Sequence, residues 1–350
     1  NTVLNEETGD YDRISTRGKL YWVATDALDF TLSVDYTKRD STEPSGTPLA
    51  LPRFDIQAGQ GTDDQLEFWG VALKATFEME SGYELISITS YRDTEYAFDG
   101  DDDMQPQLFQ QTFFDEYNEQ FTQEFRIQSP AEGNFTWLAG LYYFDSERST
   151  GRSSTIGEDL FAASLGPAAA FAWGTAFAPS TVDNTSYAAF FHSDWALSDN
   201  LTMTFGVRYN EDKKTADWQQ VNVNASGGAV PPLALFPGAA FGFFDKEFKD
   251  THRENSTSPT IALNYQFDNG TLIYGRYSRA AKAGGFNADF VLRPDLDAFE
   301  HDQETVDSYE LGLKATMLED TVRLNFAAFQ MDFEDYQVQS FVDNPPYTTS

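Results

Sequence analysis

Strict alternation of apolar and polar residues is the feature that most constrains this chain. The segment LTMTFGVRY, residues 201–209, has large apolar side chains at every odd position and small or polar residues between them. Successive side chains of a β-strand point to opposite faces of a sheet, so this pattern predicts a strand with one apolar and one polar face. The turn formers Ser198-Asp199-Asn200 precede it, and the segment before them is also strand-like. Residues 186–209 are therefore predicted to form a β-hairpin.

The same hairpin recurs along the chain. Five further segments of similar pattern each contain a short turn near their middle: 18–36, 71–91, 122–144, 259–278 and 308–329. The expected turns are Thr25–Ala27, Ser81-Gly82, Pro130–Gly133, Asp268–Gly270 and Glu319-Asp320. The Asn-Gly pair at 269–270 is a strong hairpin signal. Six hairpins would give about twelve strands, most of them longer than the average strand.

Much longer segments separate these hairpins: roughly 40–65, 99–117, 149–184, 215–252 and 284–301. Soluble sandwiches have turns of mixed length and shorter strands. Long strands with short turns at one end and long loops at the other are typical of an outer-membrane barrel. Aromatic residues near strand ends suit its interfacial girdles: Trp22, Trp137, Tyr143, Trp195 and Tyr209. The sequence thus predicts an all-β fold, a transmembrane antiparallel β-barrel; the alternative is a large soluble β-protein.

Composition excludes several other classes of protein. The chain has no cysteine, which removes disulfides, thiolate metal sites and cysteine nucleophiles. Its 56 acidic residues against 23 basic ones give a formal net charge of -33, the wrong sign for nucleic-acid binding. No uncharged stretch predicts a transmembrane helix, since the nearest, 160–179, is interrupted by Gly166, Pro167 and Gly174.

Four segments, in this order along the chain, resemble the TonB-dependent outer-membrane receptors. They are QEFRIQSP (123–130), YAAFFHSDWALSDNLTMTFGVRYNEDKK (187–214), YGRYSRAAKAGGFN (274–287) and SYELGLKATMLEDTVRLNFAAFQMDFEDYQ (308–337). The resemblance covers nearly all the hairpins and is weakest in the long loops. It implies a barrel of about 22 strands around an N-terminal plug, with short periplasmic turns and long extracellular loops. It also implies uptake of a scarce nutrient, most often a ferric siderophore, powered by TonB through a box near the N-terminus.

Unlike complete members of this family, residues 1–350 are expected to contain no plug, no TonB box and no terminal strand ending in an aromatic residue. We therefore expect residues 1–350 to be a single domain, the central part of a receptor barrel, in the bacterial outer membrane. Expected partners are TonB, a ferric siderophore or other small ligand, and outer-membrane lipid and lipopolysaccharide. No nucleic acid, cofactor or enzymatic activity is expected. The alternatives are a passive porin-like channel, a receptor for oligosaccharide or cobalamin, and a soluble carbohydrate-binding β-protein.

The segment YSRAAKAGGFNADF, residues 277–290, combines a lysine with two glycines. A phosphate-binding loop needs the order GxxxxGK[ST] before a helix, whereas here Lys282 precedes Gly284-Gly285. We instead expect a strand that enters a long loop, with glycines that allow positive φ where the chain leaves the sheet. Alternation places Arg276 and Lys282 in the lumen, where Lys282 and Asn287 would contact an anionic ligand.

Five other charged residues are predicted to face the lumen: Glu124, Arg126, Arg208, Glu310 and Lys314. Charges are costly there without water or partners, so we expect them to pair with one another or with a plug. A ligand contact near the barrel mouth is the alternative for any one of them.

Two of the predicted extracellular loops are apolar. Segment 149–184 contains Phe171 and Trp173, and segment 215–252 contains Phe241 and Phe243. Exposed apolar runs usually mark a contact surface, and aromatic rings offer large contact area with little entropy to lose. We expect both loops to lean over the barrel mouth and share a ligand pocket. Alternatively, they pack on each other as a lid.

Two further clusters carry weaker signals. The acidic run DGDDDMQ, residues 99–105, offers oxygen ligands for Ca²⁺ but lacks the spacing of a defined calcium loop. A solvated acidic tip is the simpler interpretation. His192 and Asp194 share a strand face, but no nucleophile lies at a recognisable elbow.

The pattern makes two sharp structural predictions. About twelve antiparallel strands should form one curved sheet with all short turns at one end and two unpaired edges, and a neighbour should cover those edges. A register slip of one residue would reverse every side chain. The residues predicted to face lipid are Leu201, Met203, Phe205, Val207, Ile261, Leu263, Ile273, Leu311, Leu313 and Leu324. The neighbours predicted to face inward are Thr202, Thr204, Asn264, Gln266, Glu310 and Lys314.

Overall fold

The structure, a computed structural model, describes residues 9–42, 59, 61–102, 105–107, 110–157, 159, 174–224, 246–287, 299–319 and 321–338. The regular elements in this part of the chain are all strands. They are β1 (Tyr11–Thr25), β2 (Leu28–Ser41), β3 (Asp63–Glu78), β4 (Glu84–Asp101), β5 (Gln110–Gln128), β6 (Phe135–Ile156), β7 (Gly174–Phe177), β8 (Ser180–Ala196), β9 (Leu201–Asn224), β10 (Lys246–Gln266), β11 (Leu272–Lys282), β12 (Gly285–Phe286), β13 (Glu300–His301), β14 (Glu304–Met317) and β15 (Val322–Glu334). None of the described residues forms a helix with the length and apolar character needed to cross a membrane.

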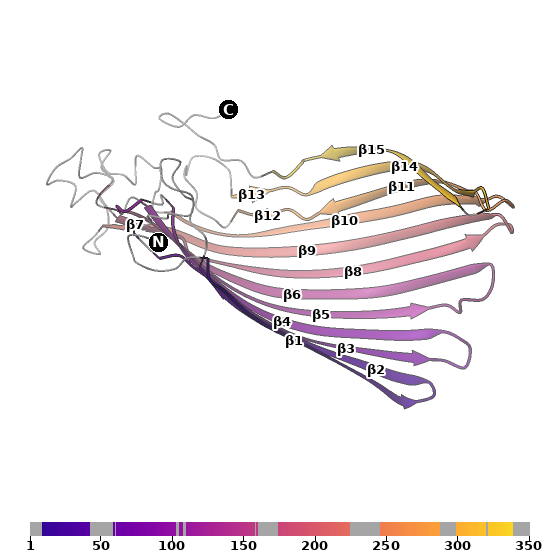
Figure 1. The fold of residues 1–350 in the computed structure, drawn as a ribbon, viewed down its shortest axis with the longest axis horizontal. Helices are drawn as coiled ribbons and strands as arrows, with labels where there is room; N and C mark the ends of the chain where they lie inside the picture. Colours follow the sequence, from indigo (N-terminus) through magenta and orange to yellow (C-terminus); the bar gives the residue numbers. More distant parts are fainter. Residues whose placement is uncertain are drawn as a thin grey trace.

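Thirteen strands form one antiparallel sheet whose neighbours follow one another along the chain (Figure 1). β7 and β8 share one place in it, because both lie between β6 and β9. β8 pairs with β6 up to Thr150, and β7 pairs with β6 from Ser153 onward. Pro179, which has no backbone N–H to donate, lies between β7 and β8. If β7 and β8 are counted as one strand position, the sheet has twelve strand positions, in agreement with the predicted number of about twelve strands.

All the short turns lie at one end of the sheet, on the right in Figure 1, which we call the turn end. The other end is the long-loop end. The short connections fall where the sequence predicts them; for example, β1 ends at Thr25 and β2 begins at Leu28. Gly82 and Gly270 both have φ of 80° in their turns, a conformation that residues with a Cβ rarely adopt.

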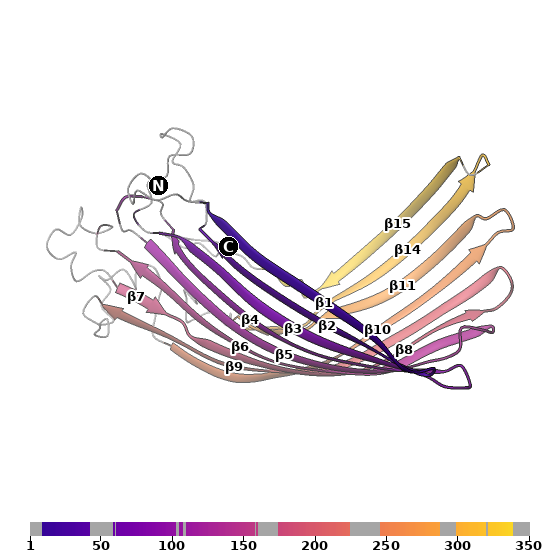
Figure 2. The same ribbon diagram turned by 60° about the horizontal axis from the view of Figure 1, so that its bottom comes forward.

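The sheet is curved but not closed. Within the described part of the chain, β1 pairs only with β2 and β15 only with β14. Every side chain of β15 is exposed. Figure 2 shows the strands as an open trough with β1 and β15 at its two rims. The prediction of a partial barrel with two free edges is confirmed.

Strand register places the predicted apolar and polar sets on opposite faces, because residues paired across antiparallel strands point to the same side. The apolar pairs are Phe205–Ile261, Met203–Leu263 and Ile273–Leu313, and the polar pairs are Thr202–Asn264 and Arg276–Glu310. All residues of the apolar set share one face, and all residues of the polar set share the other, as the alternation predicts. The apolar set is not in a dry core, since Leu263 is 49% exposed and Leu311 68%. We call its side the outer face and the other the inner face.

The strands extend further toward the long-loop end than the sequence predicts. All five expected loops contain strand residues: 40–65, 99–117, 149–184, 215–252 and 284–301. β4 reaches Asp101, β5 begins at Gln110 and β9 continues to Asn224. The prediction of loop there is wrong because the backbone ladder continues where the side chains are polar, and an apolar alternation cannot reveal such strands.

Little of this single-layered sheet is buried. The core cluster consists of Trp218 and Phe299, with Phe248 packed against it. It lies at the long-loop end, where the β12–β13 hairpin covers the inner face.

Candidate functional site

The β12–β13 hairpin folds onto the inner face of β9 and β10. Gly285 and Phe286 pair with His301 and Glu300. Phe299, which precedes β13, stacks on Phe248 of β10 with 4.9 Å between ring centroids. The same ring meets Trp218 of β9 edge-on, also at 4.9 Å. Trp218 is only 2% exposed, so the hairpin seals this part of the inner face.

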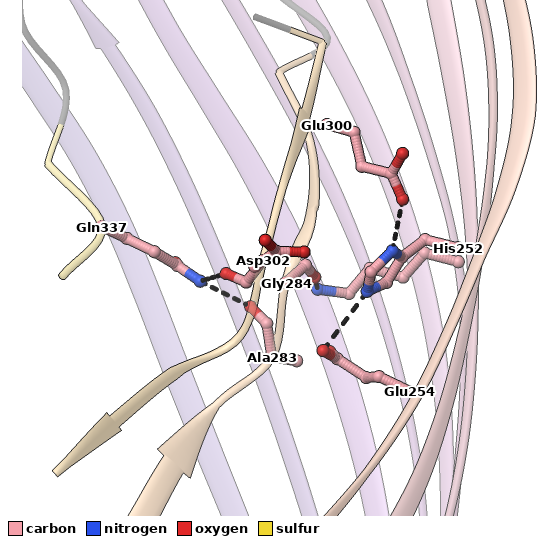
Figure 3. Close-up of polar contacts among 8 residues, drawn as sticks. His252, Glu254, Ala283, Gly284, Glu300, Asp302 and Gln337 are labelled. Carbon is pink, nitrogen blue, oxygen red and sulfur yellow. Dashed lines mark hydrogen bonds and ion pairs between the residues drawn. The ribbon is translucent and has the colours of Figure 1, made fainter. Parts of the chain in front are cut away.

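A polar network fixes the hairpin beside this aromatic cluster (Figure 3). His252 of β10 lies between two carboxylates: its Nδ1 is 2.6 Å from Glu300 Oε1, and its Nε2 is 3.2 Å from Glu254 Oε2. The side chains of His252 and Glu254 are both nearly buried. Lys214 of β9 donates a hydrogen bond to the carbonyl oxygen of Gly284. Two strands of the sheet therefore hold both ends of the hairpin.

Gln337, which follows β15, holds the hairpin from the other side (Figure 3). Its Nε2 donates to the carbonyl oxygens of Ala283 at 3.2 Å and Asp302 at 2.8 Å. Its backbone N–H donates to Glu304 Oε2 at 2.9 Å. The hairpin is thus tied both to β9–β10 and to the segment after β15.

This network lies beyond the apolar band of the outer face. At this level the outer-face residues of β9 are polar: Glu211, Lys213, Thr215 and Asp217. Burial alone would lower the pKa of His252, but the hydrogen bond with Glu300 and the nearby carboxylate of Glu254 outweigh it and raise the pKa. The pKa of His301 is lowered, because the ring is partly desolvated although its residue is exposed, and because it lies near Lys214 and His252. Of these two histidines, His252 is therefore the one whose protonated form the site favours.

The two glycines before the hairpin allow close packing. The described glycines with positive φ are Gly9, Gly82, Gly133 and Gly270. Gly284 and Gly285 therefore do not adopt the positive φ that glycine allows. A Cβ on Gly284 would lie 2.5 Å from the carbonyl oxygen of His301. One on Gly285 would lie 3.1 Å from Lys214 Cδ.

Lys282 is the last residue of β11, before the hairpin, and Asn287 directly follows β12. The Nζ of Lys282 is 3.8 Å from Glu304 Oε2, and its side chain is 63% exposed. Asn287 is exposed, and its backbone N–H donates to Phe299. Arg276 is also exposed on the inner face but lies six residues earlier in β11, roughly 20 Å along the strand. The structure brings the first two to one rim and leaves Arg276 deeper. Phe171, Trp173, Phe241 and Phe243 lie outside the described residues.

Most of the other charges predicted to face inward have partners on the inner face. Arg126 pairs with Glu124, and Glu310 accepts a hydrogen bond from Tyr274. Arg208 donates to Asn210 at 2.8 Å. The remaining contacts are Lys314 over the ring of Tyr274 at 5.7 Å and His192 Nε2 beside Asp194 Oδ2 at 3.8 Å. Among these contacts, Arg126 and Glu124 pair with each other as predicted, whereas Glu310, Arg208 and Lys314 contact neutral side chains.

A second inner-face region at the long-loop end is open. A cavity of about 460 Å³ lies where β4, β5 and β6 approach this end, lined by Tyr96, Phe98, Asp102, Gln110, Thr112, Phe114 and Arg152. The rings of Tyr96 and Phe114 are 5.7 Å apart. The guanidinium of Arg152 lies 5.9 Å from the centre of the Phe114 ring. Aromatic rings and one cation thus line an open pocket on the inner face.

The sequence prediction missed this pocket because it assigned 99–117 to a loop. A signal was present: Tyr96, Phe98 and Phe114 fall at even positions, which face the inner side of β4 and β5. Large aromatic residues on an otherwise polar face are candidates for ligand contact.

The neighbouring acidic run uses its carboxylates in hydrogen bonds. Asp99 accepts from Gln111 at 2.8 Å, and Asp102 accepts from Thr112. Burial raises the pKa of Asp102, which lies just past the end of β4. Over the part of the chain that the structure describes, no group of three or more acidic or histidine residues could hold a metal ion.

The family model of the TonB dependent receptor-like β-barrel matches residues 4–350. Similar solved structures include the ferric yersiniabactin uptake receptor FyuA from Yersinia pestis, with a TM-score of 0.72, 14% identity and coverage of 95% of this chain and 47% of that chain. For the siderophore receptor PiuA from Acinetobacter baumannii, the TM-score is 0.62 and the identity 13%, with coverage of 93% of this chain and 50% of that chain. For the closed form of the ferric-catecholate import receptor Fiu from E. coli K12, the TM-score is 0.63 and the identity 13%, with coverage of 93% of this chain and 51% of that chain. The chain spans about half the length of these proteins, and identities this low show a shared fold alone.

Proposed function

Because the chain belongs to the TonB-dependent receptor-like β-barrel family of the Gram-negative outer membrane, we propose that it is part of a receptor for a ferric siderophore. In this proposal the complex enters the barrel from the long-loop end and is imported with energy supplied through TonB. Structures of similar fold include receptors named for ferric yersiniabactin and ferric catecholates, which supports an iron chelate as the substrate class.

The open pocket on β4–β6 is the observation that carries this proposal. Its rings, Tyr96 and Phe114, offer flat apolar contact to an aromatic ligand. Arg152 attracts anionic oxygens and can contact a ring face at the same time. The net charge of -33 repels an anion at long range, but salt screens that repulsion beyond roughly 8 Å. Once an anionic aromatic chelate is inside the mouth, the local arginine decides its position.

Lys282 and Asn287 would supply polar contacts from the β11 side of the mouth. Both are exposed, and the lysine keeps most of its surface free although it pairs with Glu304. Phe171, Trp173, Phe241 and Phe243 are proposed to cover the ligand from the two long loops. Arg276, which lies deeper, would meet the ligand only on its way through the barrel.

Equilibrium binding of a ferric catecholate to the full-length receptor tests the proposal. We expect Arg152→Ala and Phe114→Ala each to weaken binding about tenfold, because each removes one half of a cation–aromatic contact pair. Arg126→Ala is the matched control, since Arg126 lies near the turn end of β5 and pairs with Glu124. Unchanged binding of the ferric catecholate in both pocket variants would exclude the pocket as its binding site. Steady ion conductance of the receptor without any ligand would favour a passive channel instead.

A further inference from the structure

A shallow apolar groove runs along the outer face of β5, β6, β8 and β9. Its volume is about 320 Å³. Four of its lining residues form one row across the strands: Phe125, Leu141, Ala189 and Tyr209. Ala189 is the small member of this row, between Leu141 at 62% exposure and Tyr209 at 45%. Because the side chain of Ala189 is small, it leaves room above it and forms the floor of the groove.

The groove becomes more polar toward the long-loop end. The next outer-face row in that direction is Gln123, Tyr143, Tyr187 and Glu211. Beyond it, Asp145 accepts hydrogen bonds from Tyr143 Oη at 3.2 Å and Thr185 Oγ1 at 3.1 Å. An amphiphile lying here would point its tail toward the turn end and its headgroup toward the long-loop end. In an outer-membrane barrel, that is the orientation of an outer-leaflet lipid.

Two cations lie directly beyond the polar end of the groove. Lys213 and Arg253 are paired across β9 and β10 on the outer face, one outer-face position past Glu211. Both are exposed, and neither has an ion-pair partner within the described ranges. Like charges directly opposite each other destabilise a sheet, so an anionic group between them would relieve the repulsion. Lys249, two positions further along β10's outer face, instead pairs with Asp217 at 2.6 Å.

The carboxylates of Glu211 and Asp145 restrict the kind of headgroup that fits. A phosphate placed beside them would be repelled, whereas hydroxyl groups could donate hydrogen bonds to them. The order along the outer face is therefore apolar groove, hydrogen-bond acceptors, then cations. A phosphorylated sugar that carries acyl chains has its chemical groups in this same order.

We propose that the groove and the Lys213–Arg253 pair bind one outer-leaflet phosphoglycolipid of the lipid A type. An acyl chain lies over Ala189, sugar hydroxyls donate to Glu211 and Asp145, and a phosphate contacts both cations. The inference rests on the outer-membrane location and is independent of the ligand that the receptor imports.

Native mass spectrometry of the full-length receptor with added bisphosphorylated lipid A tests this site. We expect one molecule bound per receptor. Binding should be about tenfold weaker in the double variant Lys213→Ala/Arg253→Ala, because each basic residue contributes favourably at a lipid phosphate. Ala189→Trp should fill the groove and weaken binding to a similar extent. Dephosphorylated lipid A should bind the wild type weakly and lose nothing further in the double variant.

Lys249→Ala and Ala75→Trp are matched controls, because they change a paired cation and an outer-face alanine away from the groove. Both should bind lipid A like the wild type. The proposal is overturned if phosphatidylethanolamine binds as well as lipid A, or if the controls lose as much binding as the groove variants. It is also overturned if the double variant binds lipid A as tightly as the wild type. If Ala189→Trp fails to assemble, the charge variant and the dephosphorylated lipid decide the question.

Discussion

Two regions of the inner face at the long-loop end start from the same kind of surface and differ in what fills them. Over β9 and β10, Trp218 and Phe248 are covered by the hairpin, whose Phe299 stacks on Phe248 and meets Trp218 edge-on. Over β4–β6, Tyr96 and Phe114 line a pocket of about 460 Å³ that no described segment fills. In the first region the ring of Phe299, which belongs to the chain itself, covers the aromatic residues of the sheet. In the second region no described ring covers Tyr96 and Phe114.

The comparison teaches how to recognise a binding surface in such a sheet. Aromatic residues on the inner face can pair across strands, but the sheet is a single layer and by itself leaves their inward-pointing surface uncovered. They need a partner from outside the sheet. Where the chain returns, as at Phe299, the partner is internal; where it does not, a ligand is the natural partner.

Removing Phe299 should have the largest effect on the difference between the two regions. Truncating a packed phenylalanine to alanine costs about 3–5 kcal/mol, which here falls on the attachment of the hairpin. Because the chain has no cysteine, Asn287→Cys gives a single site for a spin label. We expect Phe299→Ala to make that label mobile while the sheet stays assembled.

Phe329→Ala is the control for this experiment, because Phe329 is 68% exposed on the edge strand β15. An unchanged label spectrum in Phe299→Ala would mean that the polar network alone holds the hairpin. The contacts of Phe299 with Trp218 and Phe248 would then contribute nothing to holding the hairpin on the sheet.

Replacing His252 should have the second largest effect on the attachment of the hairpin to the sheet. Hydrogen bonds to charged groups contribute about 1.5–3 kcal/mol, and His252→Gln should lose much of this. The charged and titratable groups around it are Glu254, Glu300, His301 and Lys214. The folded-state pKa of His252 is raised above its unfolded value of about 6.5. Its contribution is therefore fully present below pH 6.5 and is lost as the pH rises through the folded-state pKa.

We expect the label at position 287 to gain mobility with rising pH in the wild-type background and to show no such transition in His252→Gln. An identical pH profile in both proteins would assign the titration to another group. The open pocket has no histidine in its lining, so ligand binding there should not share this transition.

The apolar band of the sheet is predictable because every strand in it meets two different environments. That demand imposes the alternation of Leu201–Tyr209, and turn residues such as Asn269-Gly270 set where strands reverse. The register then follows, because a slip of one residue would expose the polar face to lipid. The long-loop halves of the strands are not predictable in this way, since their outer face is largely polar and their inner face mixes polar and aromatic residues, so apolar residues do not alternate regularly with polar ones.

The hairpin and its contacts leave almost no local signal. β12 and β13 have two residues each, too few for any period. The contact that fixes them joins His252 and Glu300, which are 48 residues apart. Such a site depends on how a long connection returns to the sheet, which local propensity does not determine. The same reason explains why the purpose of Gly284 became clear only from its close approach to His301.

Gly284→Ala should produce an intermediate effect. The new Cβ would lie 2.5 Å from the carbonyl oxygen of His301, so the backbone of β13 must move. Overpacking of this kind costs about 1–3 kcal/mol. We expect partial mobility of the label at position 287. Gly206→Ala is a milder control, because its Cβ would meet His192 Nδ1 at 3.2 Å, a side-chain atom that can shift. Equal behaviour of the two variants would show that close packing at Gly284 is unimportant.

Lys282→Gln should have the smallest effect on structure and thereby separates ligand contact from hairpin support. The lysine is 63% exposed and 3.8 Å from Glu304, and exposed pairs contribute about 0–1 kcal/mol. The label at position 287 should therefore stay immobile. If Lys282 contacts an anionic ferric chelate, affinity should fall about threefold at low salt. That difference should shrink near 1 M salt, where the screening length is only about 3 Å. A more mobile label with unchanged affinity would place Lys282 among the residues that hold the hairpin, and the open pocket on β4–β6 would then have to bind the ligand without help from this rim.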